Sequence, residues 1–156
     1  MKMKRRLFLK GTFATTAMGL AVGSGLLTPK AVLAAWPKSA FEAKDAASVV
    51  TELFGKATTD ASDMISVKAP DIAENGAVVP VKVNTKMANV ESISLLVEQN
   101  GTPLVAQFNL GSKTEAYVST RIKMGKTSDV IAIVKANGKL YSARKNVKVT
   151  IGGCGG

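Results

Sequence analysis

The sequence contains one cysteine, Cys154, which stands between two pairs of glycine near the carboxyl end. The glycines are Gly152, Gly153, Gly155 and Gly156. Because glycine has no Cβ atom and adopts many backbone conformations, this segment offers no side chains to a core. Five extended residues span about 16–18 Å. We therefore predict a flexible arm over residues 152–156 that presents the thiol of Cys154 to other proteins.

The rest of the chain offers nothing that would make this thiol catalytic. A cysteine nucleophile needs a neighbouring base, usually histidine, and the sequence has no histidine. An unperturbed thiol has a pKa of about 8.5 and is mostly protonated at neutral pH. The lack of histidine and of dense acidic clusters also argues against zinc, haem or iron–sulfur sites, so we expect no cofactor and no metal. Cys154 is therefore predicted to carry a substrate covalently rather than to catalyse a reaction.

The first 34 residues have the pattern of an export signal. Arg5 and Arg6 lie in the stretch RRLFLK, which matches a twin-arginine motif, and a weakly apolar run follows from Gly11 to Leu27. The run is too rich in glycine and threonine for a membrane anchor. We predict cleavage after Ala34 or Ala35 and export of the folded protein to the periplasm. Since the chain has no obvious cofactor, a partner subunit exported with it would explain this route.

The export signal also accounts for much of the net charge of +10. Residues 1–34 contain six of the 21 Lys and Arg residues and none of the 11 acidic ones, which leaves +4 on the remainder. The remaining basic residues are scattered and are not interleaved with aromatic residues. Nucleic-acid binding is therefore not expected.

Residues 35–151 are predicted to form one domain that positions the arm. Ser39 and Glu42 fit a capping box for a single helix over residues 40–54, with Gly55 at its end. Alternating apolar residues then predict seven or eight strands, and Ile151 ends the last of them. The expected strands cover residues 65–69, 79–83, 90–98, 104–109, 115–124, 129–136, 140–144 and 147–151.

Three local signals refine this pattern. Asn100–Gly101 and Asn137–Gly138 predict tight hairpin turns with positive φ. Pro80 predicts an edge strand or the start of a strand, because proline has no N–H for a β-ladder. The fold class that results is a mainly β, immunoglobulin-like antiparallel sandwich with one N-terminal helix.

Taken together, the export motif, the helix, the strands and the terminal Gly-Gly-Cys-Gly-Gly resemble the SoxY family, the sulfur-carrier subunits of the periplasmic Sox system for thiosulfate oxidation. The resemblance covers the whole chain, and the terminal motif is its specific part. It implies that Cys154 receives thiosulfate from a c-type cytochrome as an S-thiosulfonate. It further implies a manganese-dependent hydrolase that releases sulfate, a sulfane dehydrogenase or another acceptor for the remaining sulfur, and a heterodimer with a SoxZ-like subunit.

Two other interpretations of the terminal motif stay open from the sequence. A C-terminal Gly-Gly also occurs in ubiquitin-like proteins that carry sulfur as a thiocarboxylate, but these need ATP-dependent activation. Alternatively, the domain is an exported interaction module whose Cys154 forms an intermolecular disulfide.

Overall fold

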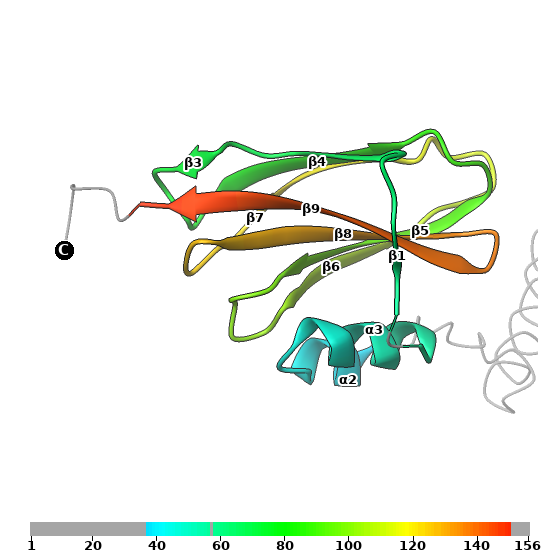
Figure 1. Cartoon of the computed structure of the whole chain (residues 1–156), viewed down its shortest axis with the longest axis horizontal. Coiled ribbons are helices and arrows are strands. Elements are labelled where there is room, and N and C mark those ends of the chain that lie inside the picture. The colour runs from blue at the N-terminus through cyan, green and yellow to red at the C-terminus, as the bar shows by residue number, and fades with distance from the viewer. Residues whose placement is uncertain (1–36, 57, 151–156) are drawn as a thin grey trace, which may run out of the picture. The chain divides into compact units, whose positions relative to one another are not determined.

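A computed structural model describes residues 37–56 and 58–150 of the chain. Two short helices come first, α2 (Lys38–Glu42) and α3 (Ala46–Phe54). They are followed by nine strands within the described residues, which form two sheets (Figure 1). None of the helices in the described part is long and apolar enough to cross a membrane.

The single helix predicted over residues 40–54 is interrupted. Ala43 leaves the helical conformation with a ψ of 146°, and Ser39 lies inside α2 instead of capping it. Asp45 caps the second helix: its Oδ1 accepts a hydrogen bond from the Ser48 backbone N–H at 2.8 Å, and its Oδ2 accepts one from Ser48 Oγ at 2.6 Å. A charged N-cap in the middle of the segment starts a new helix, which overrides the helical periodicity. Gly55 ends α3 in the left-handed region, as predicted.

The cap at Asp45 gives a prediction that depends on pH. The hydrogen bonds from the Ser48 side chain and then from its backbone lower the pKa of Asp45 below its usual value of 3.8. A carboxylate with a lowered pKa stabilises the folded state above pH 3.8, and this contribution disappears as the pH falls through the folded-state pKa. We expect Asp45→Ala to lower the melting temperature by a few degrees at pH 6, and the difference from wild type to shrink below pH 3.8.

Asp63→Ala provides a control for this measurement, because Asp63 is an exposed acid outside the helices. Thermal unfolding followed by circular dichroism from pH 6 to pH 2.5 would compare the three proteins. A melting-point difference for Asp45→Ala that stays constant over this range would contradict the assigned role of the carboxylate.

The larger sheet has the strand order β1-β9-β8-β5-β6, and β3 also pairs with β9. The smaller sheet has the order β2-β4-β7. Their bounds are β1 Asp60–Ala61, β2 Ile65–Lys68, β3 Ile72–Ala73, β4 Val79–Thr85, β5 Val90–Val97, β6 Leu104–Asn109, β7 Tyr117–Ile122, β8 Ser128–Ala136 and β9 Lys139–Val149. The mainly β, immunoglobulin-like sandwich predicted from the sequence is confirmed.

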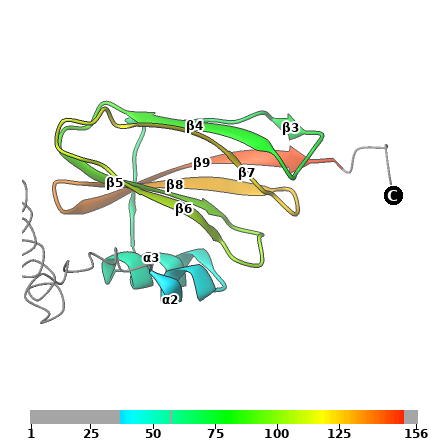
Figure 2. The ribbon, with the colours of Figure 1, turned by 180° about the vertical axis from the view of Figure 1, so that it is seen from behind.

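The main core lies between the two sheets. Ile93, Leu95 and Val97 of β5 face Val81 and Val83 of β4 across it, and all five are fully buried. A second apolar cluster lies on the other face of the large sheet. There Leu96 packs with residues of β6, β8 and β9 and with both helices. The helices therefore form a third layer on the large sheet, whereas the small sheet has its outer face uncovered by any described element (Figures 1 and 2).

Several turns and strands differ from the prediction. The two last predicted strands are one continuous strand, β9, and the short strands β1 and β3 were not predicted. Asn137 and Gly138 have φ values of 51° and 70°, which confirms that hairpin. β5 and β6 also pair antiparallel on either side of Asn100–Gly101, so a hairpin is present there. Neither of these two residues has a positive φ, so the predicted type of turn is wrong. The amide of Asn100 instead binds another loop, as described below.

Pro80 lies in the middle strand of the small sheet, close to the strand's start. It pairs with Arg121 of β7 on one side, while β2 ends at Lys68, opposite Lys82. At Pro80, β4 thus has a neighbouring strand on one side alone, and the missing N–H disrupts no bond to β2. The prediction of an edge strand is wrong, and that of a strand start is consistent with this register.

Candidate functional site at the end of β9

The predicted carrier residue and its arm lie outside the described residues. This applies to Cys154, to Gly152, Gly153, Gly155 and Gly156, and to Ile151. Arg5 and Arg6 of the predicted export signal also lie outside them. The part of the site that the structure describes is therefore the end of β9, from which the chain continues toward Cys154.

One side of β9 is held near its end by β3. The two strands run parallel, with Ile72 opposite Lys148 and Ala73 opposite Val149. The Lys148 N–H donates to the Asp71 carbonyl at 2.9 Å, and the Thr150 N–H donates to the Ala73 carbonyl at 3.0 Å. The main chain is thus hydrogen-bonded up to the last described residue, four positions before Cys154.

The other side of β9 is held by a threonine side chain. β8 begins at Ser128, opposite Val147, so the backbone ladder between these strands ends before Val149. There the Thr127 hydroxyl accepts a hydrogen bond from the Val149 N–H at 3.0 Å and donates to the Val149 carbonyl at 3.4 Å. Thr127 therefore extends the pairing of β9 past the end of β8.

A close backbone contact lies beside this strand end. The Met124 N–H donates to the Gly76 carbonyl at 2.7 Å. A Cβ atom on Gly76 would lie 2.3 Å from the Met124 carbonyl oxygen and 2.9 Å from a Val149 methyl group. Side chains larger than hydrogen do not fit there, so glycine is required for the approach of the two loops rather than for a turn.

The loop that contains Met124 is fixed by the amide of Asn100. Asn100 Nδ2 donates to the Lys123 carbonyl at 2.8 Å, and its Oδ1 accepts from the Gly125 N–H at 3.0 Å. Met124 itself is buried. Loops from three parts of the chain thus support the end of β9.

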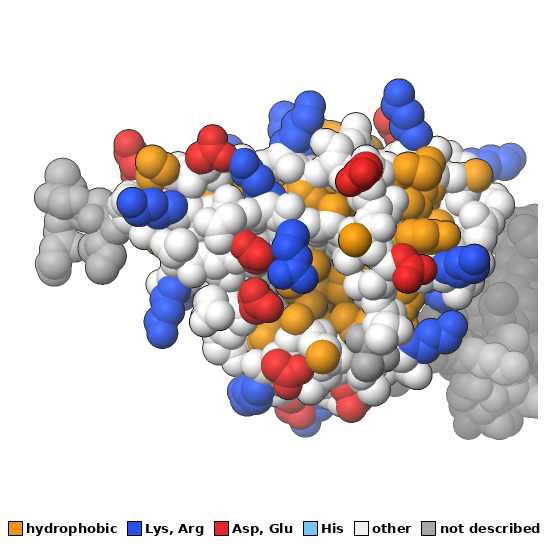
Figure 3. Space-filling view, in the orientation of Figure 1, with side chains coloured by type: hydrophobic (Ala, Val, Ile, Leu, Met, Phe, Trp, Pro, Cys, Tyr) orange, Lys and Arg blue, Asp and Glu red, His pale blue; other side chains and the backbone are white. Residues whose placement is uncertain are grey.

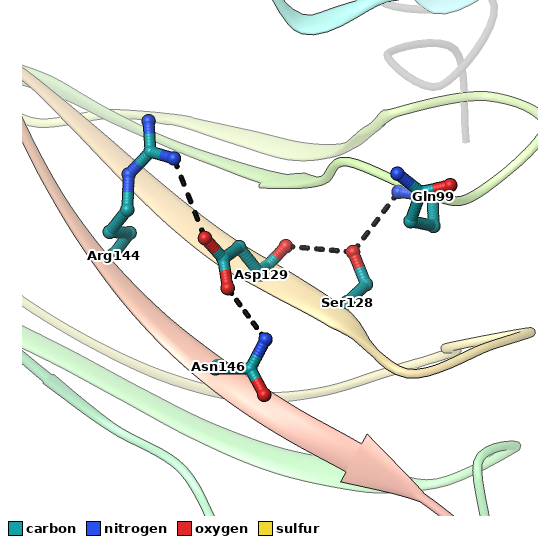
Figure 4. Close-up of polar contacts among 5 residues, drawn as sticks. All are labelled: Gln99, Ser128, Asp129, Arg144 and Asn146. Atoms are coloured by element: carbon teal, nitrogen blue, oxygen red, sulfur yellow. Dashed lines mark hydrogen bonds and ion pairs between the residues drawn. The ribbon is translucent and has the colours of Figure 1, made fainter.

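A cluster of polar residues on β8, on β9 and in the loop after β5 also holds β9 in place (Figure 4). The Asp129 carboxylate accepts from Asn146 Nδ2 at 2.8 Å and contacts the Arg144 guanidinium at 3.4 Å. Ser128 Oγ accepts from the Gln99 N–H at 3.0 Å and donates to the Asp129 carbonyl at 3.1 Å. These contacts connect β8 to β9 and to the loop after β5.

An exposed ion pair joins β9 to the residue that precedes β3. Asp71 forms an ion pair and hydrogen bond with Lys145 of β9, which lowers the pKa of Asp71. Asp71 is exposed, so the pair contributes little to stability. Among residues 37–56 and 58–150, no group of three or more Cys, Asp and Glu side chains could hold a metal ion.

Sequence reasoning missed the residues that secure the end of β9. The pairing of Ala73 with β9, the hydroxyl of Thr127 and the close approach at Gly76 all depend on contacts distant in sequence. The dipeptide Asn75–Gly76 is a turn signal, and the Val78 N–H does donate to the Asn75 carbonyl at 3.3 Å. This signal does not reveal the close approach of Gly76 to Met124. What the described residues contribute at this end of the domain is hydrogen bonding and close packing around β9.

Comparison with known proteins assigns the sandwich to a family. The model of the family described as "Sulfur oxidation protein SoxY" matches residues 50–154, a range that covers most of the chain and reaches Cys154. The chain belongs to the SoxY family. A search of curated proteins gave no match.

Solved structures agree with this assignment. The sulfur carrier protein SoxY from Chlorobium limicola f thiosulfatophilum is 42% identical, with a TM-score of 0.60 over 65% of this chain and 93% of that chain. The superoxide reductase (neelaredoxin) from Ignicoccus hospitalis is 19% identical, with a TM-score of 0.51 over 56% of this chain and 80% of that chain. At such low identity the second similarity concerns the fold alone.

Proposed function

We propose that this protein is a periplasmic sulfur carrier that binds thiosulfate-derived sulfur covalently through Cys154. The observation that carries the proposal is the family match, which extends to Cys154 and so includes the chain's one thiol. The structural similarity to a sulfur carrier at 42% identity supports it. The support of β9 up to Thr150 is consistent with a fixed base from which a glycine-rich arm extends.

Loading of the carrier would be an oxidative coupling. The Cys154 sulfur forms a bond with the terminal sulfur of thiosulfate, and the product is a cysteine S-thiosulfonate. One proton is released and two electrons pass to a c-type cytochrome, the partner implied by the resemblance. Since this chain contains no histidine, activation of the thiol would come from the pocket of that partner.

Unloading would be hydrolytic. Water attacks the outer sulfur of the S-thiosulfonate, and the bond between the two sulfurs of the former thiosulfate breaks. Sulfate leaves, a proton is released, and a persulfide remains on Cys154. A manganese-dependent hydrolase would catalyse this step, and a sulfane dehydrogenase or another acceptor would take the remaining sulfur. The chain itself acts as the substrate of these enzymes and is not an enzyme.

Export and assembly complete the proposal. Residues 1–34 act as a twin-arginine signal that contains Arg5 and Arg6, and the folded protein crosses the membrane with a SoxZ-like subunit. The mature protein then works in the periplasm as a heterodimer. Export of a folded pair gives a physical reason for this route in a chain without a predicted cofactor.

The experiment that tests the proposal is mass spectrometry of the C-terminal peptide. The heterodimer is incubated with thiosulfate and the cognate cytochrome, and the peptide is compared with that of a Cys154→Ser variant. We expect a thiosulfate adduct on Cys154 that reductant removes, and no adduct on the variant. An adduct that persists in Cys154→Ser, or that maps to Gly156, would show instead a carrier of the thiocarboxylate type.

A non-reducing gel of protein isolated from the periplasm distinguishes the remaining alternative. If Cys154 is always found in an intermolecular disulfide and never carries a thiosulfonate or persulfide, the protein is an interaction module and the carrier proposal is wrong.

A further inference from the structure

The outer face of the small sheet carries positive charge and no negative charge. Alternation along the strands turns one set of side chains to the core and the other outward. Of the eight outward side chains, three are cationic and none is acidic. They are Ser66, Lys68, Pro80, Lys82, Asn84, Tyr117, Ser119 and Arg121.

The strand register places these charges close together. Lys68 and Lys82 are directly opposite each other on β2 and β4, and Lys82 is opposite Ser119 on β7, two residues from Arg121. Like charges in such positions repel and destabilise a sheet. Within the described residues none of the three takes part in an ion pair, whereas Lys135, Arg144 and Lys145 each have one. Folding alone therefore gives no reason for this arrangement.

The cationic residues lie toward the end of the domain from which the chain continues to Cys154. Arg121 is next to last in β7, and Lys68 is the last residue of β2, just before the turn into β3. Two large apolar side chains are exposed at the same end: Ile72 of β3 at 56% and Val78, which precedes β4, at 50%. Figure 3 shows hydrophobic atoms at the surface over β3, with Asp and Glu side chains beside them, and Lys and Arg side chains along the margin formed by the small sheet.

We propose that Lys68, Lys82 and Arg121, with Ile72 and Val78 beside them, form a docking surface for the acidic surface of the enzymes that load and unload the carrier. The inference rests on the proposed function, because it assumes that Cys154 enters other proteins. A positive face near the base of the arm would steer such an enzyme to the correct end of the carrier. We call these five residues the basic docking surface.

The composition of this surface favours a transient protein partner. A permanent subunit interface is largely apolar at its centre, and this face has lysines there. A small anion is less suited to it, because the hollow of about 220 Å³ beside Lys68 and Lys82 is open to solvent and both lysines are exposed. Charge complementarity between large surfaces, in contrast, accelerates association even when each contact is weak.

The test measures how fast the cognate cytochrome loads Cys154 with thiosulfate, under conditions where the rate depends on carrier concentration. The variant Lys68→Glu/Lys82→Glu is compared with Lys113→Glu/Lys139→Glu. The control lysines are exposed, lie at the opposite end of the sandwich, and change the net charge equally. We expect the first variant to load about 10-fold more slowly at low salt and the control to stay within about two-fold of wild type. The difference should shrink at high salt.

Several outcomes would overturn the docking surface. Equal slowing of both variants would show an effect of net charge alone, and unchanged rates would show that the face is not used. Loss of the SoxZ-like subunit from the first variant would make the face a permanent interface. Binding of wild type to phosphatidylglycerol vesicles that the variant loses, with loading unchanged, would assign it to a membrane.

Two measurements keep this test separate from the proposed function. Alkylation of Cys154 by iodoacetamide should proceed at the same rate in all variants, because this small reagent needs no docking. If wild type itself acquires no adduct from thiosulfate and the cytochrome, the carrier proposal fails first. Unequal loading of the two variants can be interpreted only once wild type loads.

Discussion

Gly76→Ala will destabilise the domain and loosen the end of β9. The new Cβ atom would lie 2.3 Å from the Met124 carbonyl oxygen, which is backbone and cannot rotate away. The loops must then separate, and the hydrogen bond from the Met124 N–H to the Gly76 carbonyl weakens. Overpacking of this kind costs about 1–3 kcal/mol. For a domain of this size, that corresponds to a fall of about 4–12 °C in the melting temperature.

Gly101→Ala is the matched control, because a Cβ atom at Gly101 meets nothing within 4 Å. Gly101 also does not have a positive φ. Its melting temperature should equal that of wild type or rise slightly, since alanine reduces the freedom of the unfolded chain. Hydrogen exchange at Val149 and Thr150 should become faster in Gly76→Ala alone. Equal melting temperatures for the two variants would contradict the close packing assigned to Gly76.

Gly153→Val together with Gly155→Val will leave the fold stable and will strongly reduce thiosulfate-dependent turnover. Valine restricts the backbone and adds a branched side chain on each side of Cys154, where glycine gives both freedom and clearance. A thiol that is displaced by about 1 Å in a partner's active site can lose about 100-fold in rate. We expect a loss of that order with the complete set of partner enzymes.

The alanine variant, Gly153→Ala with Gly155→Ala, shows whether the loss of turnover depends on the size of the new side chains or on the replacement of glycine as such. It should retain more activity than the valine variant, because its side chains are smaller and unbranched. Thermal unfolding should give the same midpoint for wild type and both variants, and iodoacetamide should alkylate Cys154 in all three. Full turnover by the valine variant would show that partners do not need the glycines for access.

Much of the sandwich follows from local patterns. The alternation of Val79, Val81 and Val83 identified β4, and the apolar run from residue 130 to residue 134 identified β8, because one face or both faces of such strands must be buried. Asn137–Gly138 fixed one hairpin because glycine and asparagine tolerate positive φ. These features depend on residues that are neighbours in sequence.

Other features could not be predicted because they depend on distant partners. β1 and β3 have two residues each and are strands through their pairing with residues of β9 that lie 81 and 76 positions later. Asn100 lies in the loop between β5 and β6, but it has no positive φ, and its amide binds the backbone at Lys123 and Gly125. The helix break at Asp45 resulted from competition between a strong local cap and the periodicity of the longer segment.

The sequence by itself determined the chemistry of this protein: one thiol, no histidine, and glycines on both sides of Cys154. These are properties of residue types, and they required no coordinates. The tertiary structure alone decided how the chain is held before that thiol. Separate loops meet at one end of the sandwich and place Thr127 and Gly76 beside Val149. The same arrangement places the Ala73 carbonyl where it accepts from the Thr150 N–H. Strand register likewise brought Lys68 opposite Lys82, since pairing across a sheet is set by packing of the core face and not by spacing along the chain.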